Sequence, residues 1–82
     1  MIPNHYGRYK KADVIAKNYS IFSEDTEGVL TATEIKEAYG INIQSKDRLK
    51  HCVGFRCSNK IRGCVPVFDI IDITIKYRDG LL

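Results

Sequence analysis

The sequence has few of the residues and segments that mark membrane, secreted or catalytic proteins. Only two histidines and three cysteines occur among its 82 residues. No apolar run approaches the roughly 18 residues of a membrane-spanning helix, and residues 1–9 lack the apolar core of a secretory signal peptide. We therefore expect a cytoplasmic protein with no membrane partner.

Sequence signatures of catalysis are also missing. The chain contains no glycine-rich phosphate loop, no His-x-x-x-His pair and no nucleophile elbow. Asp69 and Asp72 are three residues apart in a segment predicted to be extended, which places their carboxylates on opposite faces. We expect a non-enzymatic protein that holds no cofactor.

The cysteines are Cys52, Cys57 and Cys64. An odd number without a secretory signal argues against a disulfide framework, so we expect reduced thiols that pack as small apolar side chains. A metal site is the sharper alternative, because His51 precedes Cys52. However, the spacing Cys-x4-Cys-x6-Cys contains no Cys-x2-Cys pair of the kind typical of structural zinc, and no metal site is predicted.

Length and composition indicate a single domain spanning residues 1–82. Hydrophobic residues make up 44% of the chain and charged residues 28%, which is typical of a folded globular protein. The pattern predicts an α+β fold of three short helices followed by a small antiparallel sheet. Residues 1–9 are interpreted as a flexible basic and aromatic arm.

The first helix is predicted within residues 10–22. Apolar side chains recur there at helical spacing and define an inner face of Ala12, Ile15, Ala16 and Tyr19. A strand over residues 18–22 is the competing interpretation, because Asn18 is a poor helix former and aromatic residues follow it. We expect the helix to end early.

The second helix, residues 32–39, has local signals at both ends. Thr31 and Glu34 form a capping box, in which each side chain can bond to the other residue's backbone amide. Gly40 can adopt the left-handed conformation that ends a helix. This two-turn helix is the best-specified element in the sequence.

A third short helix and a hairpin follow. Ser45 is a candidate N-cap for a helix over residues 46–52, with Leu49 facing inward. Beyond it, β-favouring residues on either side of a Ser-Asn-Lys turn predict a hairpin of residues 53–57 against residues 61–67.

The final segment, Ile71 to Tyr77, alternates apolar and polar residues. Such alternation predicts a strand whose buried face carries Ile71, Ile73, Ile75 and Tyr77. If that strand lies at a sheet edge, it can pair with a second copy, so a homodimer through residues 71–77 is expected. Tyr19, Tyr39 and Tyr77 are interpreted as core residues.

Two short helices joined by residues 40–44, the second basic and followed by a hairpin, resemble the helix-turn-helix with a wing of many DNA-binding domains. Ile35, Ile41 and Leu49 supply apolar residues where that motif packs its helices. Lys36 and Lys46 depart from it, because the motif has a small and a branched apolar residue there. The resemblance implies a winged-helix-like arrangement.

Charge is the main functional clue. Residues 46–62 carry an excess of positive side chains over a single acid, Asp47. Such segregation favours one face that meets an anionic partner, and we predict binding to RNA or DNA. The predicted binding residues are Lys46, Arg48, Lys50, Arg56, Lys60 and Arg62, with Arg8, Lys10 and Lys11 from the N-terminal arm.

The alternative function is that of an inhibitor or antitoxin-like adaptor that binds a host enzyme, nuclease or toxin. It would use the sheet edge or an acidic surface that includes Glu24, Asp25 and Glu27. A richness in Ile, Lys, Asn, Tyr and Phe is typical of A·T-rich genomes, and a phage or plasmid regulator of a host factor fits both interpretations. A charged face with no partner is the plain alternative.

Overall fold

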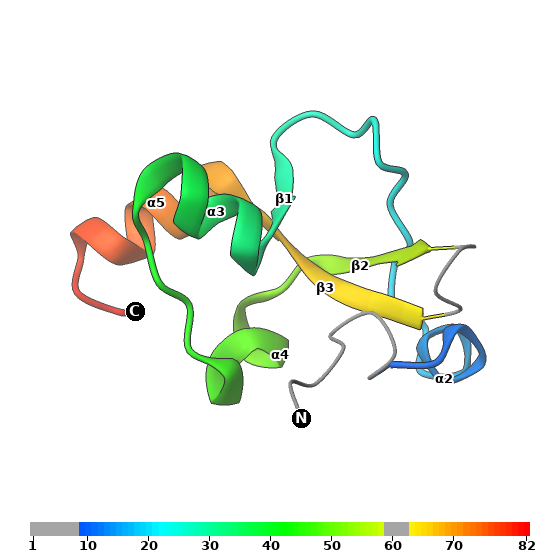
Figure 1. The fold of residues 1–82 in the computed structure, drawn as a ribbon. Coiled ribbons are helices and arrows are strands. Elements are labelled where there is room, and N and C mark those ends of the chain that lie inside the picture. Colours follow the sequence, from blue (N-terminus) through cyan, green and yellow to red (C-terminus); the bar gives the residue numbers. More distant parts are fainter. Residues whose placement is uncertain (1–8, 59–62) are drawn as a thin grey trace, which may run out of the picture.

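The computed structural model describes residues 9–58 and 63–82, and their α+β class confirms the prediction. In chain order the elements are α2 (Lys11–Ala16), β1 (Val29–Thr31), α3 (Ala32–Tyr39), the short 3-10 helix η1 (Ser45–Asp47), α4 (Arg48–His51), β2 (Gly54–Ser58), β3 (Gly63–Asp69) and α5 (Ile70–Arg78) (Figure 1). The order differs from the expected one, because β1 precedes α3 and the chain ends in a helix. None of the helices described is long and apolar enough to cross a membrane.

The sheet is antiparallel, with strand order β1-β3-β2. The predicted hairpin is confirmed as β2 and β3, although β2 begins one residue later than expected and β3 runs on to Asp69. Strand β3 is central and almost entirely buried, since helices and both neighbouring strands cover it. It therefore connects the two parts of the core.

The core consists of two clusters of buried side chains. The larger, which we call the α3–α5 cluster, consists of Ala32, Ile35, Ile41, Ile43, Phe68 and Ile73. The smaller, the hairpin cluster, consists of Val14, Phe55 and Cys64. Phe68 and Cys64 lie toward opposite ends of β3, so each cluster occupies its own end of the strand.

Helix α3 forms as its end signals predict. Thr31 Oγ1 accepts a hydrogen bond from the Glu34 amide at 3.2 Å, and Glu34 Oε1 accepts one from the Thr31 amide at 2.9 Å. Gly40 ends the helix with φ of 72°, a conformation that costs glycine little. Both ends of α3 are thus satisfied by local contacts.

Helix α2 is shorter than predicted, and its inner face is different. It ends at Ala16, and Asn18 has a positive φ of 61°. Val14 is buried, whereas Ile15 is 56% exposed, which corrects the predicted inner face of Ala12, Ile15, Ala16 and Tyr19. A helix of six residues makes too few turns for an apolar stripe to decide which side packs.

The third predicted helix is confirmed only in outline. Residues 45–47 form the 3-10 turn η1, and α4 follows it without a side-chain cap from Ser45. His51 is buried and Leu49 is 46% exposed, which reverses the expected inward position of Leu49.

The predicted strand over residues 71–77 is wrong, because this segment lies in helix α5. The carboxylate of Asp69 accepts a hydrogen bond from the Ile71 amide and caps the helix, and Asp72 pairs with Lys76 one turn later at 3.1 Å. Only Ile73 of the predicted apolar face is buried, and Tyr77 is 56% exposed. The expected homodimer through a strand edge loses its structural basis.

The helix-turn-helix resemblance is not borne out in the packing. Helix α3 packs on β1 and β3, whereas α4 packs on β3, and the two helices lie on different sides of the sheet in Figure 1. Ile41 and Ile43, in the connection between the helices, are buried in the α3–α5 cluster. The connection therefore fills the core instead of making a tight turn between paired helices.

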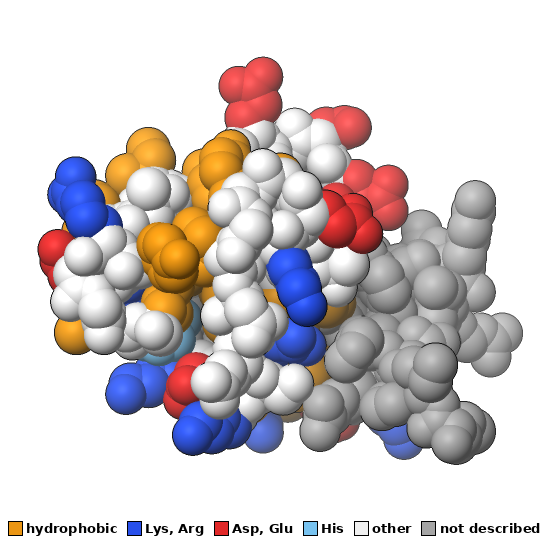
Figure 2. Space-filling view, turned by 60° about the vertical axis from the view of Figure 1, so that its left-hand side comes forward, with side chains coloured by type: hydrophobic (Ala, Val, Ile, Leu, Met, Phe, Trp, Pro, Cys, Tyr) orange, Lys and Arg blue, Asp and Glu red, His pale blue; other side chains and the backbone are white. Residues whose placement is uncertain are grey.

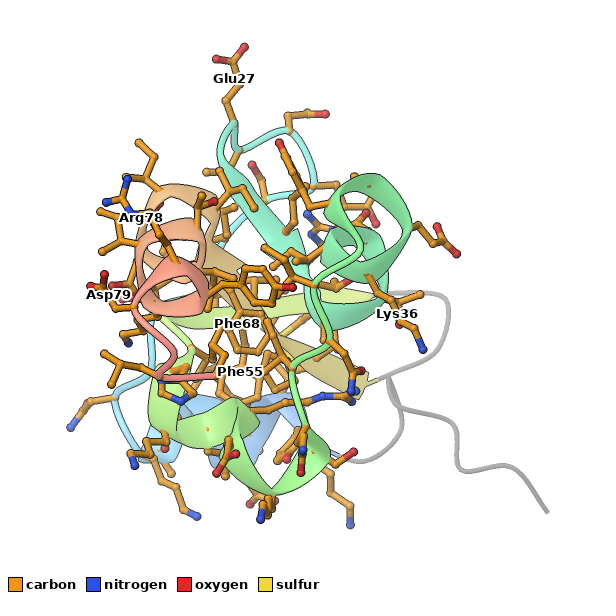
Figure 3. The ribbon with its side chains drawn as sticks, turned by 90° about the vertical axis from the view of Figure 1, so that its left-hand side faces the viewer. Glu27, Lys36, Phe55, Phe68, Arg78 and Asp79 are labelled. Atoms are coloured by element: carbon orange, nitrogen blue, oxygen red, sulfur yellow. A yellow bond between two sulfur atoms is a disulfide. The ribbon has the colours of Figure 1, made fainter. Side chains whose placement is uncertain are left out.

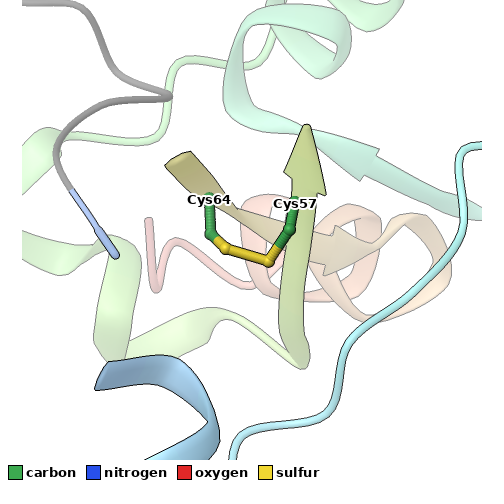
Figure 4. Close-up of a disulfide and its surroundings, with 2 residues drawn as sticks. All are labelled: Cys57 and Cys64. Atoms are coloured by element: carbon green, nitrogen blue, oxygen red, sulfur yellow. A yellow bond between two sulfur atoms is a disulfide. The ribbon is translucent and has the colours of Figure 1, made fainter. Parts of the chain in front are cut away.

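The expectation of three reduced thiols is also wrong. Cys57 and Cys64 are register partners in the hairpin and form a disulfide (Figure 4). Antiparallel pairing brings side chains seven residues apart in the sequence directly opposite one another, a proximity that cysteine spacing alone does not reveal. Cys52 is the free cysteine of the described residues.

Candidate nucleic-acid interface

Exposed lysines from α2 and from the η1–α4 segment share one end of the molecule. Side chains of both segments line the same hollow: Asp13 and Lys17 come from α2 and the residue after it, and Leu49 comes from α4. The two segments are therefore neighbours. We define the basic surface as the exposed side chains Lys10, Lys11, Lys17, Lys46 and Lys50.

Acidic side chains gather at the opposite end. Glu24, Asp25 and Glu27 are exposed in the loop between α2 and β1. In Figure 2, acidic side chains gather at the top of the molecule, and most Lys and Arg side chains lie lower. Figure 3 labels Glu27 at the top, far from α4. The charge segregation read from the sequence thus has a spatial counterpart in the described residues.

Two acids lie beside the lysines. Asp13 is exposed on α2 and Asp47 is half-buried at the end of η1. Arg48, which follows Asp47, is half-buried, and its Nε donates a hydrogen bond to the Ile43 carbonyl at 3.3 Å. Arg48 therefore helps to fix the segment leading into α4 and contributes its charge from a restrained position.

Arg56 is not at the surface where it was predicted. It is 6% exposed, its Nη1 lies 3.0 Å from Glu34 Oε1 and 3.2 Å from Oε2, and its Nη2 donates to the Val29 carbonyl at 3.1 Å. Side chains alternate between the faces of β2, so burial of Phe55 on one face leaves Arg56 on the other, beside α3. Arg56 is a structural cation and is removed from the predicted binding set.

Glu34 has two structural roles, as half of the capping box and as partner of Arg56. Partial burial tends to raise the pKa of Glu34, but hydrogen bonds from Thr31 and the positive charge of Arg56 outweigh it and hold the pKa below its usual 4.5. The carboxylate stays charged, and it connects α3 to β2 across 22 residues of sequence.

Three predicted binding residues cannot be placed. Arg8, Lys60 and Arg62 lie outside the described residues. The first residue described, Tyr9, accepts a backbone hydrogen bond from Cys64 at 2.7 Å, and its ring meets that of Phe55 edge to face at 5.2 Å. Tyr9, the last residue of the predicted flexible arm of residues 1–9, is therefore anchored beside β3.

Lys17 belongs to the basic surface although the prediction did not include it. It follows a helix whose lysines were predicted, but only tertiary packing brings it next to α4. Beside it, Tyr9 and Tyr19 meet the buried Phe55 ring edge to face, the second at 5.0 Å. Aromatic surface and Lys17 thus lie together around a hollow of about 40 Å³, which Asp13 also lines.

The free thiol of Cys52 and the search for a metal site concern residues outside the basic surface. Partial burial raises the pKa of the Cys52 thiol above its usual 9.0, so this cysteine is a weak nucleophile. Within residues 9–58 and 63–82, no group of three or more His, Cys, Asp or Glu side chains is arranged to hold a metal ion.

Comparison of the chain with protein-family models, with curated proteins and with solved structures yields no match. Functional inference therefore rests on the geometry and charge described above.

Proposed function

We propose that this protein binds nucleic acid, RNA or DNA, through the basic surface. The observation that carries the proposal is the gathering of exposed lysines from two separate segments at one end, with the acidic loop at the other. Lysines so placed can each approach a phosphate of one nucleic-acid strand and release its counterions. A cytoplasmic location is part of the proposal.

Lysine favours affinity over sequence recognition. An ammonium group acts as a point charge, whereas arginine offers the bidentate geometry that reads guanine edges. Arg56, the buried arginine, is committed to Glu34 and Val29. We therefore infer contacts that are mainly to phosphates and that depend weakly on sequence.

Single-stranded nucleic acid fits this surface better than a duplex groove. Helix α4 has only four residues and does not pair with α3, so it is a poor candidate to enter a major groove. The 40 Å³ hollow is too small to enclose a base, but the exposed part of Tyr19 can stack an unpaired base across its mouth.

Fluorescence anisotropy with labelled single-stranded RNA, duplex RNA and duplex DNA at two salt concentrations tests the proposal. We expect binding that weakens steeply with salt and is tightest for the single strand. A Lys46→Glu, Lys50→Glu double variant should bind about tenfold more weakly or worse, with a smaller salt slope.

The matched control is Lys36→Glu, compared with Lys50→Glu alone, because it changes the net charge equally at an exposed position of α3 that lies outside the basic surface. Equal losses in these two single variants would mean that only net charge matters. Failure of the wild-type protein to bind any of the three probes would overturn the proposal.

Binding of a host protein is the second candidate, and the exposed acidic loop favours it. Addition of a strand to β2 is blocked, because Phe22 and Ser20 already exchange backbone hydrogen bonds with Phe55. Gly54 permits this close approach, since a Cβ there would lie 2.5 Å from the Ser20 carbonyl oxygen. The acidic loop and the short outer edge of β1 (Val29–Thr31) are therefore the surfaces left for a protein partner, and the charge of the loop favours the loop.

A pull-down from cell lysate tests this second candidate. The comparison is between the wild-type chain and a variant with Glu24, Asp25 and Glu27 changed to lysine. A partner retained by both chains would exclude the acidic loop as its binding surface.

A further inference from the structure

Helix α5 carries apolar side chains on opposite faces. Ile73 is fully buried, but Ile71 and Ile75, two residues before and after it, are 70% and 44% exposed. Because each residue advances about 100° around a helix, both lie nearly opposite Ile73 and side by side, one turn apart. A helix with apolar residues on two faces is expected to be covered on both.

The outer face of α5 continues onto α3. Tyr39, at the end of α3, is 55% exposed and lines an open groove together with Ile70, Ile71, Thr74 and Ile75. In Figure 2, hydrophobic side chains gather on the upper left of the molecule, apart from most Lys and Arg side chains. We call the exposed side chains Tyr39, Ile71 and Ile75 the α5 face. Contiguous apolar surface of this kind marks interaction sites.

We propose that the α5 face binds the α5 face of a second copy of this chain, with the two helices antiparallel. Charge complementarity specifies this occupant. Asp69 and Asp72 make the start of α5 negative, and Lys76 and Arg78 outweigh Asp79 at its end. Antiparallel packing with Ile71 against Ile75 of the second copy brings Arg78 of each chain toward Asp69 of the other.

The helix dipoles favour the same orientation. In an antiparallel pair, the positive N-terminal end of each helix meets the negative C-terminal end of the other, whereas a parallel pair places like ends together. The contact of Ile71 with Ile75 of the second copy forms twice, because a two-fold interface uses the same patch on each copy.

The size of the patch sets the strength of the interaction. A helix of nine residues is about 14 Å long, so the apolar contact is smaller than the roughly 800 Å² per partner of a typical stable interface. We therefore expect a weak dimer in the micromolar range or above. Dimerisation would join two basic surfaces in one particle and raise the apparent affinity for a long nucleic acid by bivalency.

Sedimentation equilibrium of the purified full chain tests the proposal, over loading concentrations from about 1 μM to about 1 mM. The average mass should rise from 9.4 kDa toward twice that value. Ile71→Glu should keep the mass at the monomer value throughout, since a charge would be desolvated in the interface. Glutamate in the first turn of a helix is favourable, so the variant should fold.

The matched control is Ile15→Glu, which places the same charge on an isoleucine of α2 that is 56% exposed. Ile15→Glu should self-associate as the wild-type chain does. Circular dichroism of both variants verifies that they are folded. The inverse charge variant, Arg78→Glu, should weaken the dimer several-fold.

A wild-type chain that remains monomeric at all concentrations would overturn the proposal. So would self-association that survives Ile71→Glu, because another surface would then be responsible. An unchanged dimer in Arg78→Glu would overturn the antiparallel arrangement. These outcomes do not depend on nucleic-acid binding, which the anisotropy experiment measures separately.

Discussion

The two ends of β3 are stabilised in different ways. At the end near Asp69, the α3–α5 cluster buries six side chains, and Phe68 and Ile73 are fully enclosed. At the other end, the hairpin cluster buries only three, with the Cys57–Cys64 disulfide and the edge-to-face contacts of Phe55 beside them. A small domain can therefore combine one end that depends on apolar burial with one that also depends on a covalent link.

The ion pair between Glu34 and Arg56 joins these ends. Glu34 belongs to the helix that covers the larger cluster, and Arg56 lies on the strand that carries Phe55. This contact makes the stability of each end depend on the other. Four predictions test whether the two ends of β3 are stabilised independently.

Phe68→Ala should destabilise the protein most. Removing a fully buried aromatic ring from the larger cluster should lower the free energy of unfolding by about 3–5 kcal/mol, measured by urea denaturation. Phe55→Ala should cost less, because Tyr9 and Tyr19 lie partly at the surface and can move into the space. Equal losses would contradict the comparison of the two ends.

Reduction of the disulfide should have the next largest effect. Opening a loop of this length should cost about 2 kcal/mol and lower the Tm by roughly 10 °C. Hydrogen exchange should increase in β2 and in β3 near Cys64, with little change in α3. Cys52→Ala, which leaves the disulfide intact, is the control. Uniform loss of protection along the chain would show that the ends unfold together.

Glu34→Gln should lower the free energy of unfolding, measured by thermal or urea denaturation, by less than reduction of the disulfide does. It leaves the Arg56 charge buried without a counterion, and Arg56 Nε already has no hydrogen-bond partner among the described residues. Because Glu34 is 44% exposed, we expect a loss of only about 1–2 kcal/mol. Glu37→Gln, on the exposed side of the same helix, should change stability by less than about 0.5 kcal/mol.

Acidification should have the smallest effect. The pKa of Glu34 is lowered by folding, so its contribution to stability is present above pH 4.5 and is lost as the pH falls through the folded-state value. Unfolding curves below pH 4.5 should show a smaller acid-induced loss in Glu34→Gln than in the wild-type chain. An identical loss in both would mean that other carboxylates dominate.

Helices α3 and α5 show what local sequence can and cannot predict. The ends of α3 are specified by Thr31, Glu34 and Gly40, whose contacts span at most four residues, and the prediction was correct. In α5 the alternation of isoleucines indicated a strand. Because these residues form a helix, Ile73 lies on the buried side of α5, and Ile71 and Ile75 lie on its exposed side. Asp69 was an available cap signal, but its capping role depends on where β3 ends.

The sequence also predicted only part of the candidate site. Lys46 and Lys50 are exposed as expected, because lysine keeps its ammonium group in water almost anywhere on a surface. Arg56 was misplaced, since its position on β2 relative to α3 follows from strand pairing. Lys17 was missed for the same reason, because its neighbours on α4 lie far along the chain.

The α+β class, the capped helix α3, the β2–β3 hairpin and the separation of charge could be predicted from the sequence, because they depend on composition and on contacts between near neighbours. The helical conformation of residues 71–77, the Cys57–Cys64 disulfide and the burial of Arg56 against Glu34 follow from packing between distant segments. Each of these depends on which distant segments pack together, and the free energy of packing outweighs the small local preferences of short segments.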